Sequence, residues 1–438
     1  MNLYSRLVVL FSLFCLLSLG LACGGGDDDD DDDQARDCAT DDPLEITGTD
    51  PDSGFNLEEQ VLNVTGGCFD DLTSARLIAA GGDEIELEAT APDNETLTVT
   101  VPAGIPVGSY TLSIARGDLS AETDYAAVSN ILVTAGIDWA FYVVDVSDIN
   151  NPREVLKNRP MGEGLDLGVP VVDATGTKVY FTYAPGENQN AIYRADLLDG
   201  GNVEQISPAV PAIWDSPDAS PVGGQITAMG CSEVGNVCDI YVLPEDGGSA
   251  TKVAALEEVL IIDGKETTSW AFAIPVYSPD GTKIAFLSDS LDGDGTHYDV
   301  IVVMNADGSD KQIAYWEEGG VHGYNWLNWT ADDHLIWGRV DDELGTQVIY
   351  MLKVGETDAV QVTAPTDGFG DFVWLVYSPL TQGFMLQPAQ TAEQVYYPVT
   401  IGGGITAGDG VPVRVPDPNA PGEYMAHYST AEWFGWSN

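Results

Sequence analysis

The chain has 438 residues, which is long enough for two or three domains with hydrophobic cores of their own. Its 70 acidic residues outnumber its 16 basic ones and give a formal net charge of −54. This balance argues against nucleic acid as a partner, because phosphate contacts need Lys and Arg. The 48 glycines and 24 prolines indicate many turns, and therefore many short strands.

Residues 1–22 have the pattern of a secretory signal peptide. Arg6 supplies the positive start, residues 7–19 are apolar, and small residues precede Cys23. A cysteine at this position resembles the bacterial lipobox, and the resemblance implies that Cys23 is lipidated and anchors the mature protein to the outer membrane. An ordinary cleaved signal and an uncleaved membrane anchor are the alternatives.

Residues 23–42 form a Gly- and Asp-rich acidic tether in this interpretation. Three glycines follow Cys23, and seven consecutive aspartates occupy positions 27–33. Adjacent carboxylates repel one another and bury nothing, so the run favours an extended spacer over a folded element. Metal binding by the aspartates is the alternative, although nothing in the sequence shapes them around an ion.

Four cysteines remain after the signal peptide and the lipid acceptor. Cys231 and Cys238 flank a short turn and are expected to face each other across a hairpin as a disulfide. Cys38 and Cys68 would then join the end of the tether to the first domain. Two disulfides indicate an exported protein, on the periplasmic or the cell-surface side of the envelope.

Residues 43–134 predict a small antiparallel β-sandwich. Short alternating runs such as QVLNVTGGCF, ETLTVTVPAG and SNILVTAG are separated by turns. The ordered set PLEITGTDPDSG, VLNVTGGCF and LTVTVPAGIPVGSYTLSI resembles the IPT/TIG immunoglobulin-like family. The resemblance implies an Ig-like binding or spacer module rather than a catalytic one.

Residues 137–438 contain a repeat of roughly 50 residues, about one four-stranded blade each. A first-strand pattern and a third-strand pattern each recur six times. The chain opens this region with a third strand and closes it with a first strand near Trp433, so we expect a six-bladed β-propeller closed by the C-terminal strand. Whether the shared blade has three strands or four stays open. One aligned position of the first strand carries Asp173, Ser220, Ser278, Thr330, Ser378 and Ser437.

The unit YSPDGTKIAF…VMNADG resembles the TolB-like propeller repeat. The resemblance implies the propeller fold. It does not imply a role in the Tol-Pal system, whose propeller follows a different N-terminal domain and is not normally lipidated.

One polar cluster suggests a cation site. The segment SDSLDGDGTHYD holds Asp289, Asp292, Asp294 and Asp299, and calcium binds several carboxylate and carbonyl oxygens from one short loop. Position twelve of an EF-type loop begun at Ser290 is Ile301 rather than an acid. A soluble hairpin loop without metal is the alternative.

Aromatic residues precede the repeated position, and they are expected either to pack between blades or to bind a sugar or peptide. These residues are Tyr277, Trp329, Tyr377 and Trp436.

The sequence lacks the common enzyme signatures, so no catalytic residue is assigned. We expect an all-β, lipid-anchored envelope protein that presents a propeller to a protein or glycan ligand, with calcium as the one cofactor considered. One alternative is a polysaccharide-degrading lyase or hydrolase with carboxylates at the channel, for which Asp173 is the single hint. The other is a periplasmic envelope-assembly component. The sequence assigns no ligand-binding residue.

Overall fold

We describe the fold from a computed structural model of the chain. The residues it describes are 38, 42–72, 74–129, 131–136, 141–145, 153–156, 170–186, 189–232, 238–255, 258–318, 326–330, 332–341, 346–361, 372–378, 383–388, 394–401, 405–407, 411–413 and 427–434. Every regular element in these ranges is a β-strand, as expected for an all-β protein. A search of the same ranges for a helix with the length and apolar character of a membrane span finds none. The predicted signal peptide, the lipid acceptor Cys23 and the aspartate run lie outside the described residues.

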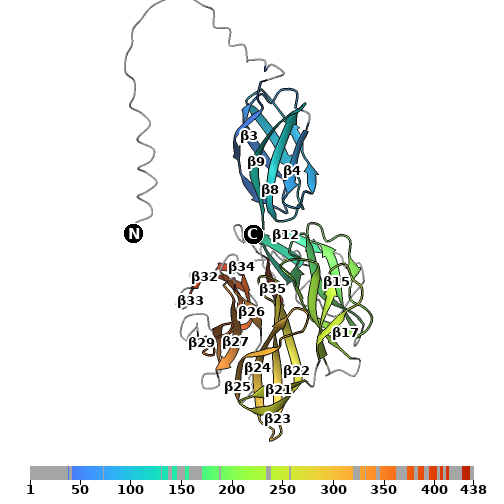
Figure 1. Cartoon of the computed structure of the whole chain (residues 1–438), viewed down its shortest axis with the longest axis vertical. Coiled ribbons are helices and arrows are strands. Elements are labelled where there is room, and N and C mark those ends of the chain that lie inside the picture. The colour runs from blue at the N-terminus through green and yellow to red at the C-terminus, as the bar shows by residue number, and fades with distance from the viewer. Residues whose placement is uncertain are drawn as a thin grey trace, which may run out of the picture.

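An N-terminal β-sandwich occupies residues 45–128 (Figure 1). One sheet has the order β1 (Glu45–Asp50), β3 (Gln60–Gly67), β7 (Thr96–Val101) and β6 (Glu88–Thr90); the other has β2 (Ser53–Phe55), β9 (Leu119–Val128), β8 (Gly108–Arg116), β4 (Ser74–Ala79) and β5 (Glu84–Glu86). Apolar residues alternate along the strands, so one face of each sheet is buried. Leu62, Val99 and Leu112 form part of the shared core.

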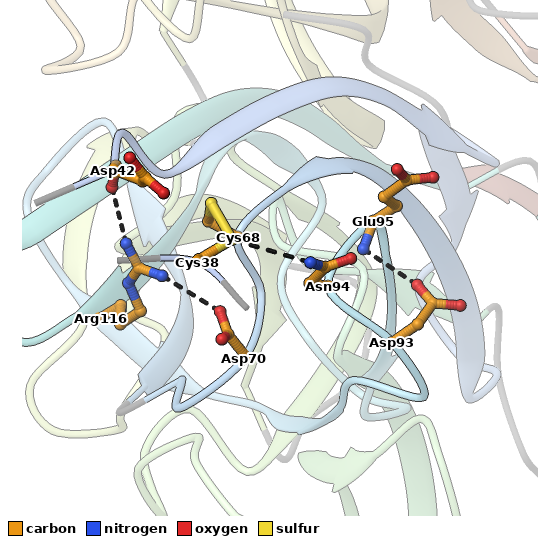
Figure 2. Close-up of a disulfide and its surroundings, with 8 residues drawn as sticks. All are labelled: Cys38, Asp42, Cys68, Asp70, Asp93, Asn94, Glu95 and Arg116. Carbon is orange, nitrogen blue, oxygen red and sulfur yellow. Dashed lines mark hydrogen bonds and ion pairs between the residues drawn. A yellow bond between two sulfur atoms is a disulfide. The ribbon is translucent and has the colours of Figure 1, made fainter. Parts of the chain in front are cut away.

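The start of the sandwich is fixed by a disulfide between Cys38 and Cys68, which confirms the predicted pair (Figure 2). The buried Arg116 strengthens this attachment, because its guanidinium donates to the Asp42 carbonyl at 2.6 Å and to Asp70 Oδ1 at 3.1 Å. The two cysteines and Asp42 lie close together, but both sulfurs are held in the disulfide and neither is a thiolate ligand. The chain therefore enters the sandwich through a covalently held segment.

The strands that follow form the six blades of a propeller, of which blades 2 and 3 are linked into one eight-stranded sheet by the pairing of β15 with β17 (Figure 1). Blade 1 contains β35 (His427–Phe434), β10 (Ile131–Gly136), β11 (Phe141–Asp145) and β12 (Arg153–Leu156). Blade 2 contains β13 (Val171–Val172), β14 (Lys178–Gly186), β15 (Gln189–Asp196) and β16 (Glu204–Gln205), and blade 3 contains β17 (Ile213–Ala219), β18 (Gln225–Cys231), β19 (Cys238–Pro244) and β20 (Thr251–Ala254).

The remaining three blades follow the same order. Blade 4 contains β21 (Val259–Ile262), β22 (Lys265–Tyr277), β23 (Lys283–Asp292), β24 (His297–Asn305) and β25 (Gln312–Glu318). Blade 5 contains β26 (Leu327–Trp329), β27 (His334–Asp341), β28 (Thr346–Lys353) and β29 (Val360–Gln361). Blade 6 contains β30 (Phe372–Ser378), β31 (Gly383–Pro388), β32 (Gln394–Ile401), β33 (Ile405–Ala407) and β34 (Val411–Val413).

The inner strands close into a ring. Contacts join β13 to β17, β17 to β22, β22 to β26, β26 to β30, β30 to β35, and β35 back to β13. The C-terminal strand β35 pairs with β10 in blade 1, so the predicted closure and the six-bladed fold are confirmed. The six predicted third strands are β11, β15, β19, β24, β28 and β32, and each is the third strand of its blade when counted from the inner strand that takes part in the ring.

Strand β10 corrects one expectation. The run SNILVTAG was expected to belong to the sandwich, whose predicted limit was residue 134, but β10 pairs with β11 and β35 inside blade 1. Blade 1 therefore has four strands, and the propeller begins at Ile131 rather than at 137. Alternation alone could not separate these assignments, because a half-buried strand has the same pattern in a sandwich and in a blade.

The sandwich is packed directly against the propeller. Asn56, which is 1% exposed, donates through Nδ2 to the Ile105 carbonyl inside the sandwich at 3.2 Å and to the Gly176 carbonyl of blade 2 at 3.1 Å. The Val107 amide also donates to the Thr175 carbonyl at 2.8 Å. Leu57 belongs to one buried apolar cluster with residues of blades 1 and 2. The two domains are therefore joined by a shared core and not only by the chain.

This packing distinguishes the two ends of the propeller. We call the end that carries the turns between first and second strands the proximal end, because the turn at residues 173–178 contacts the sandwich. The opposite, distal end carries the turns between second and third strands. The tip of blade 4 between β23 and β24 lies at this distal end, away from the sandwich (Figure 1).

We expect Asn56→Ala to loosen the junction, because it leaves two buried carbonyls without their donor. The loss should be about 1–3 kcal/mol in the free energy of unfolding, measured by denaturant titration, with faster proteolysis between residues 128 and 131. The matched control is Asn63→Ala, at an exposed position of β3, which should change stability by less than about 0.5 kcal/mol. Equal effects of the two substitutions would contradict the role of Asn56.

Candidate functional site

The repeated position of the first strands serves the proximal turns. Asp173, Ser220, Ser278 and Thr330 are all buried. In blade 4 the Lys283 amide donates to Ser278 Oγ at 2.9 Å, and in blade 5 the His334 amide donates to Thr330 Oγ1 at 3.0 Å. The side chain of Ser378 and the whole of Ser437 lie outside the described residues. These polar residues hold a turn that recurs from blade to blade.

Asp173 performs the same task with a carboxylate. Its Oδ1 accepts hydrogen bonds from the Thr177 and Lys178 amides at 2.9 and 2.8 Å, and its Oδ2 accepts one from Thr175 Oγ1. Both oxygens are therefore engaged in the turn at the proximal end. This arrangement argues against Asp173 as a catalytic carboxylate at the propeller channel, the role for which the sequence made it a candidate.

The aromatic residues that precede this position pack between blades where they are described. Tyr277 and Trp329 are each 4% exposed, and Trp329 Nε1 donates to the Val276 carbonyl of the preceding blade at 3.3 Å. The side chains of Tyr377 and Trp436 lie outside the described residues. Tyr277 and Trp329 therefore serve the core rather than a ligand platform.

Blade 4 is longer than a four-stranded blade at its distal end and has an additional strand there. The strand β22 is 13 residues long, and the additional strand β21 pairs with its first residues through the turn Asp263–Gly264. Both turn residues have positive φ, of 49° and 77°, which is the geometry of a two-residue hairpin turn and the reason that Asp-Gly suits it. The blade thus carries two hairpins at its distal end.

The second of these hairpins is organised by Asp292. Its Oδ1 accepts from the Asp294 and Thr296 amides at 2.9 and 2.8 Å, and its Oδ2 accepts from Lys265 Nζ at 3.2 Å. These donors, led by the Thr296 amide, lower the pKa of Asp292 to about 2. The carboxylate is therefore a structural acceptor in the loop, with its oxygens directed to protein donors.

Asp289 and Asp299 form a carboxylate pair one layer deeper. They are direct partners across β23 and β24, and Asp299 is in turn opposite Glu317 on β25. Burial and then the nearby Asp299 raise the pKa of Asp289 to about 6. Glu317 is held by Arg339 of blade 5, with Nη1 to Oε2 at 2.8 Å. Asp289, Asp299 and Glu317 therefore form a row of acids across three strands of blade 4, and Arg339 of blade 5 contacts one end of it.

The four predicted calcium ligands are not gathered around one point. Asp289 and Asp299 face each other, Asp292 caps its own loop and Asp294 is exposed at the tip. Within the described ranges, the one group of three candidate ligands with atoms close enough to share an ion is the disulfide group near Asp42. Calcium at this loop stays a prediction without a formed site to support it.

Blade 3 closes its distal hairpin covalently. Cys231 and Cys238 are direct partners across β18 and β19 and form the second predicted disulfide, with a Cα–Cα distance of 4.0 Å. The bond restrains the tip of this hairpin. The distal end thus presents a cross-linked hairpin in blade 3 beside the extended hairpins of blade 4.

The inner strands of these two blades share a feature that the sequence did not indicate. Ser216 on β17 and Ile274 on β22 have positive φ of 47° and 50°, and each lies four residues before the repeated serine of its blade, within a β-bulge. A β-branched residue such as Ile274 seldom adopts this conformation. The bulge separates Asp215 from Asp218, whose pKa is raised to about 7 by burial. Asp218 Oδ2 accepts from the Tyr277 amide at 2.6 Å and so links blades 3 and 4.

Comparison with known proteins adds similarities of low identity. No family model matches the chain, and no curated protein matches it. Among solved structures, TolB from Acinetobacter baumannii aligns at 13% identity and a TM-score of 0.46 over 79% of this chain and 81% of its own. An oligogalacturonate lyase in complex with manganese aligns at 11% and 0.42 over 85% and 96%, and the oligogalacturonate lyase of Vibrio parahaemolyticus at 11% and 0.41 over 83% and 96%. The propeller assignment rests on the strand pairing described above.

We expect loss of the distal disulfide to destabilise blade 3 locally. The double substitution Cys231→Ser and Cys238→Ser should cost about 2–3 kcal/mol in the free energy of unfolding, because a short loop regains its freedom in the unfolded chain. Thermal unfolding followed by calorimetry measures the change. The matched control, Cys38→Ser with Cys68→Ser, should instead lower the transition of the sandwich. Identical melting profiles for the two variants would contradict this separation.

Asp289→Asn should stabilise the protein at neutral pH. A raised carboxyl pKa means that the folded state holds the proton more tightly, so stability decreases as the pH rises from about 4 to about 6. The asparagine should remove this penalty, with a gain of about 1–2 kcal/mol above pH 7 after allowance for solvent screening, and no gain near pH 4. Denaturant titration at several pH values measures it.

The control for this experiment is Asp294→Asn, which removes an exposed carboxylate from the tip of the same loop. It lowers the net negative charge by the same amount without touching the pair. A gain for Asp289→Asn that is independent of pH, or matched by Asp294→Asn, would overturn the explanation.

Proposed function

We propose that this chain is an exported, lipid-anchored envelope protein that presents the distal end of its propeller to a protein or glycan ligand without catalysing a reaction. The two disulfides support export, because such bonds persist in oxidising compartments. The outer-membrane anchor rests on the lipobox-like Cys23, and the IPT/TIG assignment of the sandwich rests on its sequence motifs. In this proposal the sandwich is the spacer.

One observation carries the proposal: the sandwich is packed on the proximal end of the propeller. The hydrogen bonds of Asn56 and the shared apolar cluster bind blades 1 and 2 to the spacer. The chain enters the sandwich at Cys38, whose disulfide partner Cys68 lies near Arg116 and away from Asn56, and in this proposal the lipid-anchored segment precedes Cys38 (Figure 2). The distal turns are therefore the loops that a partner beyond the membrane can reach, and propeller loops are ordinary binding sites.

The alternative of a polysaccharide-degrading enzyme needs two acids from different inner strands at one rim. In the part of the chain that the structure describes, Asp173 is engaged in a proximal turn, and Asp215 and Asp218 belong to the same strand. The observations therefore favour binding as the leading function. A periplasmic assembly role would use the same distal surface, and it differs from display in where the partner lies.

Photo-crosslinking in intact cells tests the use of the distal end. A photoreactive amino acid in place of the exposed Asp294 marks the distal tip of blade 4, and one in place of Val222, which is 69% exposed in a proximal turn, is the matched control. We expect adducts from position 294 and at least tenfold fewer from position 222, scored by mass spectrometry for protein and by sugar staining for glycan. Adducts from position 222 alone would contradict the proposal.

A further inference from the structure

The distal hairpin of blade 4 ends in an unusual strand. Within the strands that the structure describes, β21 pairs with β22 alone, so its other edge carries unpaired backbone groups. Its sequence is VLII, without a charged residue. Exposed edge strands usually carry charges that discourage pairing with another chain. The outer strands of the first four blades follow that rule with Arg153, Glu204, Lys252 and Glu317.

The side chains of β21 alternate between core and solvent. Ile262 is buried at 1% and packs in the core of blade 4, with Leu260 against the same cluster. Val259 and Ile261 are 60% and 58% exposed. In a two-residue hairpin the residues that flank the turn bond to each other, so Ile262 bonds toward β22. By alternation, Val259 and Ile261 direct their N–H and C=O groups to the unpaired edge.

Negative charge surrounds this edge. Glu266 lies directly opposite Ile261 and is exposed, and Asp263 is exposed in the turn. Lys265, which flanks the turn, donates to Asp292 and to the hydroxyl of Tyr298, and Lys311 donates to Glu258 beside the start of β21, so both positive charges are locally compensated. A strand that pairs with β21 would therefore place its side chains beside two exposed carboxylates and two exposed aliphatic residues.

We propose that β21 is a docking edge for an extended polypeptide strand of a partner protein, in which basic residues alternate with aliphatic ones. Backbone hydrogen bonds to Val259 and Ile261 would supply affinity, and Glu266 and Asp263 would select positive side chains. A second copy of this chain is disfavoured as the occupant, because two chains of net charge −54 repel each other. A sugar is disfavoured because the exposed side chains on this strand are aliphatic rather than aromatic.

This inference rests on the proposed use of the distal end and names the partner's chemistry there. A synthetic peptide tests the partner's chemistry by itself, independently of whether the distal end binds a partner in cells. The probe is an amidated nine-residue peptide of alternating valine and lysine, titrated against the full chain by fluorescence anisotropy at 50 and 500 mM salt. We expect saturable binding that weakens at least tenfold at the higher salt.

Two peptide controls identify the mode of binding. A peptide with the same charges but with an N-methyl group on every backbone amide has no N–H donor on either edge, and it should bind at least tenfold more weakly. A valine–glutamate peptide should not bind. Equal binding of the N-methylated and the unmodified peptide would overturn the proposal, because it would show charge attraction without strand pairing.

Protein variants locate the edge. Ile261→Pro removes one outward N–H without touching the bonds to β22, and Ile261→Lys adds a positive charge; each should weaken the valine–lysine peptide at least tenfold. The matched control is Val360→Lys, which is 55% exposed on the outer strand of blade 5 and should change binding less than twofold. Circular dichroism confirms the fold of each, and Ile261→Lys serves if the proline variant unfolds.

The remaining outcomes each decide a point. Dimers in sedimentation that disappear in Ile261→Pro would show that a second copy occupies the edge, and would overturn the basic partner. Failure of the peptide together with distal adducts in cells would overturn this inference and leave the proposed function standing. Adducts from the proximal position alone would overturn the proposed function itself.

Discussion

The pairing of β35 with β10 holds the molecule together. It joins the last described strand to residues directly after the sandwich, and it closes the six blades into a ring. The same strand β10 follows β9 after two residues, so the closing blade and the sandwich cannot move far apart. Asn56 and Leu57 then complete the junction with blade 2. Ring closure and domain docking are thus one structural event.

That event makes the two ends of the propeller unequal. The proximal end is occupied by the sandwich and by turns whose polar residues satisfy backbone groups, as Asp173 and Ser278 do. Polar side chains whose acceptor atoms are occupied by backbone amides are not free to bind a ligand or to transfer a proton. The distal end instead carries departures from the repeat: the disulfide of blade 3, the carboxylate pair of Asp289 and Asp299, and the added strand β21. The features that distinguish this propeller from a plain repeat therefore lie at its distal end.

Whether the sequence predicts one of these features depends on how far apart in the chain the residues that determine it lie. The Cys231–Cys238 disulfide and the six third strands depend on spacing and alternation, which are local, and the sequence predicts them; the Cys38–Cys68 disulfide follows because these are the two cysteines that remain. The pairing of Asp289 with Asp299 depends on strand register, and the pKa of Asp289 depends on burial by a neighbouring blade. The positive φ of Ile274 lies in a β-bulge of β22, and the free edge of β21 depends on which strands of the fold pair with it. No single segment carries that information.

The acidity of the chain explains how an uncharged edge can be tolerated. Strand pairing brings backbones within about 4.8 Å, which is shorter than the Debye length of about 8 Å at physiological salt. Repulsion between two copies is therefore barely screened at the distance where β21 could pair with another β21. A basic strand meets attraction over the same distance. The charge that the outer strands of blades 1 to 4 carry locally is here supplied by the whole surface, so it blocks self-association while leaving the backbone groups of β21 accessible to a partner of opposite charge.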